Sequence, residues 1–213
     1  MSHGVVPAAA ADGARGLLAP LARRLARLGV SPNVVTVAGL VVTLGGAAVL
    51  AADRPLAGGL LLLVGTLGDA LDGQLARAAG SGTRFGAFLD STLDRVADAA
   101  LGAAAIWLGH VHGDPVLLLA GIAALVASSL VPYVRAKAES FGVTGAVGTA
   151  PREARIALYL IGVLLWAATG DGRAFLVAVI VVAVLATITV VERVIHVTRA
   201  LRSAGQHQNE GNR

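Results

Sequence analysis

Long hydrophobic stretches, separated by short polar breaks, dominate the chain from residue 33 to residue 199. Six of them are long enough to cross a bilayer as helices, since a spanning helix needs about 20 apolar residues. Prolines stand at or just before several of the predicted starts, where a missing N–H costs a helix least. The pattern therefore predicts an all-α integral membrane protein with six transmembrane helices, at residues 33–52, 56–79, 84–109, 115–140, 152–170 and 173–199.

A shorter amphipathic segment precedes the first predicted span. In "ARGLLAPLARRLARLG", leucines recur near helical spacing on one side, whereas Arg23, Arg24 and Arg27 fall on the other. The segment is too short and too charged to span, so it predicts an amphipathic helix lying on the inner membrane surface. We therefore expect three regions: a disordered start with this interfacial helix at 1–30, a six-helix domain at 31–200, and a disordered polar tail at 201–213.

Composition agrees with a membrane protein and excludes several classes of function. Only 14% of the 213 residues are charged, against roughly 25% in soluble domains, and the mean hydropathy is +0.76. The absence of cysteine excludes disulfides, thiolate metal sites and a cysteine nucleophile. The sequence pI of 10.6 does not indicate a nucleic-acid partner, because no continuous basic face or aromatic stacking platform accompanies the charge.

The distribution of basic residues predicts the orientation in the membrane. With the amino terminus inside, only Arg54 and Arg173 of the 17 Lys and Arg residues fall in outer loops. Because cytoplasmic loops carry an excess of positive charge, both termini are expected in the cytoplasm. The preference for Arg over Lys, with abundant Ala, Gly and Val, is typical of a GC-rich bacterial genome. We therefore expect a multi-pass protein of the bacterial cytoplasmic (inner) membrane, in contact with membrane lipids.

The second and third predicted spans carry four aspartates near their cytoplasmic ends: Asp69, Asp72, Asp90 and Asp94. A carboxylate at the bilayer centre costs at least ~2.5–3.5 kcal/mol, so a group of four calls for an explanation. Asp69 and Asp72 share one helical face, and Asp90 and Asp94 share another. A helical hairpin would turn these two faces toward each other.

Facing carboxylates repel one another in a low dielectric, so either protons or cations must neutralise them. Oxygen ligands without Cys or His favour hard ions such as Mg²⁺, Mn²⁺ or Ca²⁺. Two such ions about 3.5–4 Å apart form the clamp used in phosphoryl-type displacement, and we interpret the aspartates as a two-metal site. The alternative is that they are solvated residues at helix ends; Asp98, one turn further on, fits that description or is a partner of Arg95.

The same stretch resembles a known family signature. The pattern Asp-x2-Asp-Gly-x2-Ala-Arg-x8-Gly-x3-Asp-x3-Asp is present in full, at Asp69, Asp72, Gly73, Ala76, Arg77, Gly86, Asp90 and Asp94. It is similar to that of the CDP-alcohol phosphotransferases, integral membrane enzymes of phospholipid synthesis, and "SPNVVTVAGL" resembles the start of their first span. The resemblance implies metal-dependent attack of an alcohol on the β-phosphorus of a CDP-linked lipid, with release of CMP, commonly in a homodimer.

The resemblance also implies roles for individual residues. Asp69, Asp72 and Asp90 would hold one divalent cation, and Asp69, Asp90 and Asp94 a second, with Mg²⁺ expected and Mn²⁺ as the alternative. Asp94 would also be the general base. The residues implied to contact CDP-diacylglycerol are Asn33, Thr36, Gly73, Arg77 and Thr83; the alternative for Arg77 is a cationic membrane anchor.

A second group of basic residues bears on the acceptor alcohol. This group lies at the inner ends of the last three predicted spans and consists of Arg135, Lys137, Arg152, Arg155 and Arg193. A cationic pocket would suit a phosphorylated acceptor, although inner loops also carry such charge without binding a ligand. The arrangement resembles the bacterial phosphatidylinositol phosphate synthases, which join CDP-diacylglycerol to inositol 1-phosphate. That branch commonly has Glu-Arg-Pro-Glu-Arg before the fifth span, whereas residues 151–155 read PREAR.

Other functions stay open from the sequence. A phosphatidylglycerol phosphate synthase could use the same pocket for glycerol 3-phosphate, whereas a serine acceptor suits an all-cationic cluster less well. A cation-binding transporter would place its carboxylates nearer the midplane of broken, repeated helices, and no repeat is visible. An inactive scaffold with the same fold would be indicated by loss of Asp90 or Asp94, and both are present.

Overall fold

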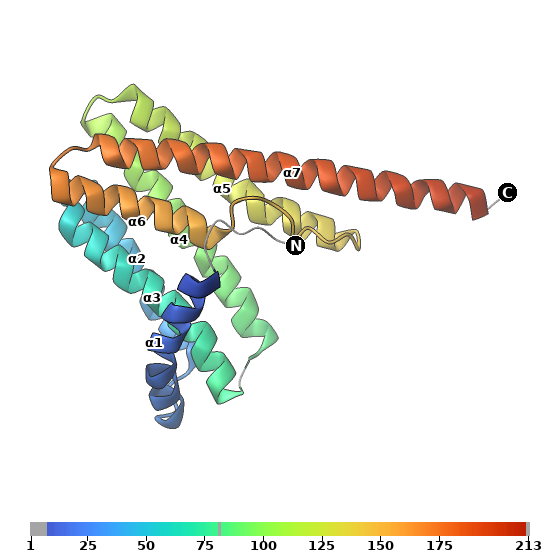
Figure 1. The fold of residues 1–213 in the computed structure, drawn as a ribbon, viewed down its shortest axis with the longest axis horizontal. Coiled ribbons are helices and arrows are strands. Elements are labelled where there is room, and N and C mark those ends of the chain that lie inside the picture. The colour runs from blue at the N-terminus through green and yellow to red at the C-terminus, as the bar shows by residue number, and fades with distance from the viewer. Residues whose placement is uncertain (1–7, 81, 212–213) are drawn as a thin grey trace.

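The computed structural model describes residues 8–80 and 82–211, with side chains described for 18–80 and 82–203. These residues form seven α-helices and no strand, so the all-α prediction is confirmed. The helices, labelled in Figure 1, are α1 (Ala8–Arg27), α2 (Pro32–Ala51), α3 (Pro55–Ala79), α4 (Arg84–Val111), α5 (Pro115–Ser140), α6 (Arg152–Thr169) and α7 (Arg173–Gly211).

The start of each helix follows from local sequence chemistry. Pro32, Pro55 and Pro115 stand at the first turn of α2, α3 and α5, where the helix has no use for their missing N–H. Asp114 caps α5, because its Oδ1 accepts from the backbone N–H groups of Val116 and Leu117 at 2.9 and 3.0 Å. The six hydrophobic segments become helices within a few residues of the predicted bounds, except that the last helix, α7, continues well past the predicted end at residue 199.

Both ends of the chain differ from the expectation. The sequence predicts an irregular start, yet α1 begins at Ala8. It also predicts a disordered tail from residue 201, yet α7 continues to Gly211. Alanine, leucine and arginine, strong helix formers, make up most of α1. The added end of α7 reads LRSAGQHQNEG and continues a helix that is already nucleated. Residues 1–7, 212 and 213 of the predicted disordered regions lie outside the described residues.

The packing leaves an opening between the two helices that carry the aspartates. In Figure 1, α1 lies against α3, and α6 runs beside α7, whose carboxyl-terminal end extends beyond the other helices. α2 packs closely along α3 and also contacts α4, whereas α3 and α4 are not among the closely packed pairs of described helices. The core at the opposite end is closed by fully buried side chains that include Leu50, Leu108, Val163 and Phe175. The end of α3 and α4 that carries the aspartates thus stays open, while the opposite end of the bundle is tightly packed.

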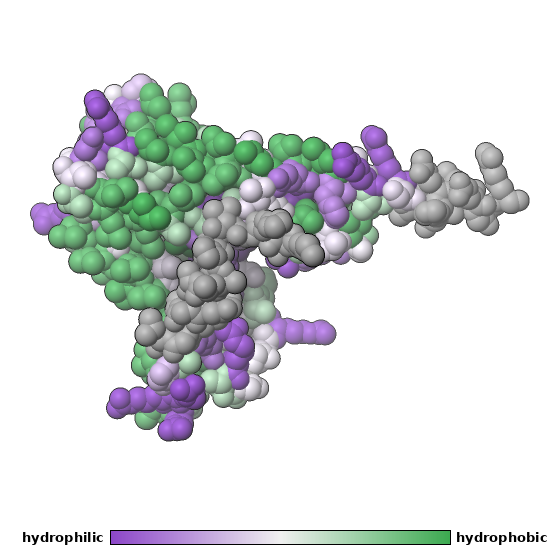
Figure 2. Space-filling view, viewed as in Figure 1, coloured by the Kyte–Doolittle hydropathy of each residue, from purple (hydrophilic) through white to green (hydrophobic). Residues whose placement is uncertain are grey.

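The surface has the character of a membrane protein. Figure 2 shows a broad hydrophobic area over the helices, with hydrophilic residues gathered toward the edges of the molecule. Four helices are long and apolar enough to cross a membrane: α2, α3, α5 and residues 173–203 of α7. α4 and α6 do not meet this standard, because charged residues such as Asp94 and Asp98 in α4 and Arg152 and Arg155 in α6 interrupt their hydrophobic stretches. Four of the six predicted spans are therefore supported by length and composition.

Close packing of α2 on α3 gives a stability prediction for two adjacent glycines. A Cβ at Gly46 would lie 2.9 Å from the Leu62 backbone nitrogen and 3.1 Å from Leu61 Cβ, whereas a Cβ at Gly45 would meet nothing within 4 Å. We expect Gly46→Ala to destabilise the protein by about 1–3 kcal/mol through overpacking. Gly45→Ala should be neutral or slightly stabilising, since alanine favours a helix. Thermal unfolding in detergent compares the two, and equal midpoints would contradict this account of the α2–α3 contact.

Candidate active site

The turn between α3 and α4 places the four aspartates at one end of the bundle. α3 ends at Gly80, which adopts a left-handed conformation with φ of 59° that glycine takes without strain. Thr83 caps the start of α4, because its Oγ1 accepts from the Gly86 backbone N–H at 2.9 Å. The short reversal brings the last turns of α3, with Asp69 and Asp72, near the first turns of α4.

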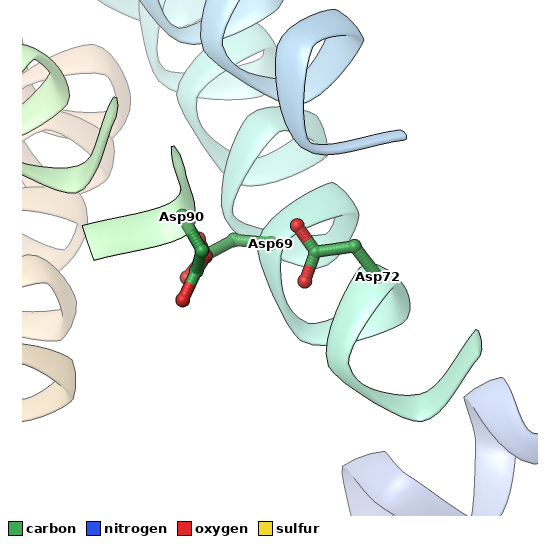
Figure 3. Close-up of side chains that lie close together, drawn as sticks. All are labelled: Asp69, Asp72 and Asp90. Atoms are coloured by element: carbon green, nitrogen blue, oxygen red, sulfur yellow. The ribbon is translucent and has the colours of Figure 1, made fainter. Parts of the chain in front are cut away.

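Asp69, Asp72 and Asp90 meet across this opening. One carboxylate oxygen from each lies within 4.8 Å of the others, and Figure 3 shows the three side chains converging from α3 and α4. Asp72 is only 6% exposed, and its Oδ2 has no hydrogen-bond partner among the residues that the structure describes. A buried carboxylate oxygen without a partner is costly, and a divalent cation would satisfy it. The all-oxygen donor set suits Mg²⁺ or Mn²⁺, so the residues fit a divalent metal site.

Asp94 lies on the far side of this cluster and is held by arginine side chains. Arg152 Nη1, from the first turn of α6, lies 2.9 Å from Asp94 Oδ1 and 2.8 Å from Asp69 Oδ2. Arg95 Nη2 lies 3.4 Å from Asp94 Oδ2. The structure therefore unites three of the four predicted metal ligands directly and connects the fourth to them through a guanidinium.

Asp98 is a site residue whose partners differ from those expected. Its Oδ1 accepts from Arg152 Nε at 3.0 Å and its Oδ2 pairs with Arg155 Nη2 at 3.4 Å. Sequence reasoning treated it as interfacial or as a partner of Arg95, and the described contacts contradict both. The signal that was available is its spacing, because Asp90, Asp94 and Asp98 recur every four residues on one face of α4.

A first cavity of about 360 Å³ opens beside Asp72 and Asp90. Of the residues implied to contact CDP-diacylglycerol, it is lined by Asn33, Thr36, Gly73 and Thr83, together with Asp72 and Asp90. No neighbour approaches Gly73 within 4 Å of a Cβ position, so the backbone there borders open space. Arg77 does not line this cavity, and its side chain is exposed.

A second cavity, of about 500 Å³, lies on the other side of Arg152. It is lined by four of the five basic residues assigned to the acceptor, Arg135, Arg152, Arg155 and Arg193, and also by Arg95 and Ser91. The fifth, Lys137, is not in its lining; the Lys137 ammonium lies 4.8 Å from the centre of the Phe141 ring. The sequence did not assign Arg95 to the acceptor site. Arg95 lines this cavity together with residues of α5 and α7, and the sequence of α4 does not show which other helices lie beside it. We call this space the arginine cavity.

Two of these arginines also hold the local backbone. Arg155 is 3% exposed and donates from Nη1 to the Ala150 carbonyl at 3.0 Å. Arg193 donates from Nε to the Val147 carbonyl at 2.6 Å and from Nη1 to the Val131 carbonyl. They tie the α5–α6 connection and α5 to the walls of the arginine cavity, so its positive charge is presented by a rigid frame.

Comparison with known proteins establishes the class of this protein. The model of the family described as CDP-alcohol phosphatidyltransferase matches residues 29–195, and the chain belongs to this family. It is therefore a phospholipid-synthesising transferase of the CDP-alcohol type, and the predicted family is confirmed.

Individual members of the family that are similar to this chain are inositol phospholipid synthases. The phosphatidylinositol phosphate synthase of Mycobacterium tuberculosis strain H37Rv is 39% identical over 145 residues, covering 67% of each chain. An archaetidylinositol phosphate synthase of Pyrococcus horikoshii is 36% identical over 182 residues, 85% of this chain and 90% of its own. Crystal structures of the Mycobacterium tuberculosis synthase superpose with a TM-score of 0.77 with CDP-DAG bound and 0.78 in complex with manganese and citrate. Both structures are 34% identical over 84% of this chain and cover 92% and 88% of their own.

Proposed function

We propose that this protein transfers the phosphatidyl group of CDP-diacylglycerol to inositol 1-phosphate, giving phosphatidylinositol phosphate and CMP. The observation that supports a phosphorylated acceptor is the arginine cavity. Arg152 lines this cavity and also contacts the aspartate cluster. A phosphate monoester in that cavity would meet several guanidinium groups, which bind phosphate by paired, charge-assisted hydrogen bonds. The names of the relatives and the CDP-DAG bound to one of them support the same reaction.

The aspartates would hold two divalent cations, with Mg²⁺ the expected ion and Mn²⁺ the alternative. Asp69, Asp72 and Asp90 would bind the first, and Asp69, Asp90 and Asp94 the second. When bound, the ions would neutralise the pyrophosphate and the charge that develops on the leaving CMP. The manganese complex of the Mycobacterium tuberculosis synthase supports this expectation.

The protein residues would orient two substrates, one in each cavity, near Asp94. Asn33, Thr36, Gly73 and Thr83 would hold the CDP portion in the first cavity, with Arg77 contacting its phosphates from the rim. Asp94 would accept the proton of the inositol hydroxyl as its oxygen forms a bond to the β-phosphorus. The bond from that phosphorus to the bridging oxygen then breaks and CMP leaves. Asp94 does not itself line the arginine cavity, but its Oδ1 lies 2.9 Å from Nη1 of Arg152, which does.

The membrane arrangement is part of the proposal. We propose that α2 to α7 all cross the bilayer, with both termini and the active site in the cytoplasm of a bacterial cell. The support is the positive-inside bias, since Arg54 and Arg173 are the only described Lys or Arg residues at the opposite ends of the helices. By family resemblance we also propose a homodimer, which crosslinking in native membranes would test.

CMP release by the purified protein tests the function. With CDP-diacylglycerol and Mg²⁺, we expect turnover when inositol 1-phosphate is offered and none with free inositol or serine, because neither free inositol nor serine brings a phosphate to the arginine cavity. A metal chelator should abolish the reaction. Turnover with glycerol 3-phosphate but not with inositol 1-phosphate would support the proposed reaction type and contradict the proposed acceptor. Absence of turnover with every acceptor, in folded protein, would contradict the whole proposal.

A further inference from the structure

Arg152 belongs to two sites at once. Its Nη1 bridges Asp69 Oδ2 at 2.8 Å and Asp94 Oδ1 at 2.9 Å, two carboxylates assigned to the metal ions. The same side chain lines the arginine cavity. Its Nε is anchored at 3.0 Å to Asp98, which is not a proposed metal ligand.

This geometry sets the guanidinium in competition with a divalent cation. A metal ion that takes Asp69 and Asp94 as ligands competes with Nη1 for the same two carboxylates. Two cations also repel strongly at such short range, because the energy varies inversely with distance and with the local dielectric. The anchor to Asp98 involves Nε instead, so Nη1 can leave the carboxylates while the side chain stays attached.

We propose that Arg152 is a positioning residue that couples the two sites. Without metal, Arg152 neutralises and orders Asp69 and Asp94. When metal binds, its guanidinium is released from them, pivots on Asp98 and becomes available to an anionic group in the arginine cavity. The inference rests on the proposed function for the use of that cavity, and it adds an order of events: the acceptor phosphate binds best after the metal.

Linkage makes the proposal quantitative. If metal binding frees Arg152 for an anion, then the anion must strengthen metal binding by the same factor. Removal of the guanidinium should do two things at once. It should raise metal affinity, since a competitor is lost, and it should abolish the coupling between anion and metal.

The expected rise in metal affinity is tested by measuring Mn²⁺ binding to the full chain in detergent, without lipid substrate. Electron paramagnetic resonance reports the concentration of free Mn²⁺. We expect Arg152→Gln to bind Mn²⁺ roughly tenfold more tightly, within the usual range of coupling between sites. Arg152→Lys keeps the positive charge but lacks the branched guanidinium that reaches three carboxylates. Its Mn²⁺ affinity should therefore fall between those of the native protein and Arg152→Gln. The matched control is Arg135→Gln, which lines the same cavity but pairs with Glu139 at 2.9 Å and should leave Mn²⁺ affinity unchanged.

Sodium sulfate, compared with sodium chloride at equal ionic strength, tests the coupling. Sulfate should tighten Mn²⁺ binding severalfold in the native protein and have no effect in Arg152→Gln. Unchanged or weaker Mn²⁺ binding by folded Arg152→Gln would overturn the proposal, as would an equal sulfate effect in both proteins. Neither readout uses inositol 1-phosphate or turnover, so a wrong acceptor would show in the CMP assay and leave this result intact.

Discussion

Replacement of Asp94 by asparagine is expected to lower CMP release by about 10²–10⁴-fold, the usual contribution of a general base. Asparagine keeps the shape of the side chain but cannot take the proton of the acceptor hydroxyl. It also removes one negative charge from the carboxylates that would hold the metal ions. The measurement is the rate of CMP release at saturating CDP-diacylglycerol and Mg²⁺, in protein whose elution and thermal unfolding match the native protein.

Asp53→Asn is the matched control for this substitution. Asp53 lies in the α2–α3 turn, where its Oδ1 is 3.4 Å from His112 Nε2, far along the helices from the aspartate cluster. Its φ of 63° is left-handed, a conformation that asparagine tolerates well. Its rate of CMP release should match that of the native protein. A loss of less than tenfold in Asp94→Asn would show that another group takes the proton.

Asp98→Ala is expected to destabilise the fold by about 3–5 kcal/mol, the usual cost of leaving a buried charge without its partner. Arg155 is 3% exposed and has Asp98 as its one carboxylate partner in the described part of the chain. Loss of that carboxylate leaves the guanidinium with the Ala150 carbonyl alone. The measurement is the midpoint of thermal or denaturant-induced unfolding in detergent.

A double substitution separates charge pairing from packing in this prediction. Asp98→Ala combined with Arg155→Met should recover most of the lost stability, because the buried charge is then removed along with its partner. Glu139→Ala is the exposed counterpart, since the Arg135–Glu139 pair is 53% and 50% exposed, and it should cost at most about 1 kcal/mol. If Asp98→Ala were as mild as Glu139→Ala, the pair with Arg155 would have no structural role.

The helices and the chemistry of the motif could be predicted from the sequence because both depend on local order along the chain. Hydrophobic length, proline positions and polar breaks located α2 to α6 and the start of α7 within a few residues, since a helix forms from neighbours in sequence. The spacing of Asp69 and Asp72, and of Asp90 and Asp94, put each pair on one helical face for the same reason. A hard-metal site near one end of the bundle followed from carboxylates alone.

The sequence did not predict where the chain's charges meet across helices. Arg152 and Asp98 lie far apart in sequence and on different helices, so no periodicity relates them. Yet their ion pair, together with the contacts of Arg152 to Asp69 and Asp94, links the aspartate cluster to the arginine cavity. Lys137 shares a helix with Arg135 but lies over Phe141 instead of lining that cavity. The opening between α3 and α4 likewise depends on how α2 packs against both helices. Local periodicity thus determined the helices and the donor atoms, whereas long-range packing decided which charges face each other, because pairing between helices depends on their relative placement in space.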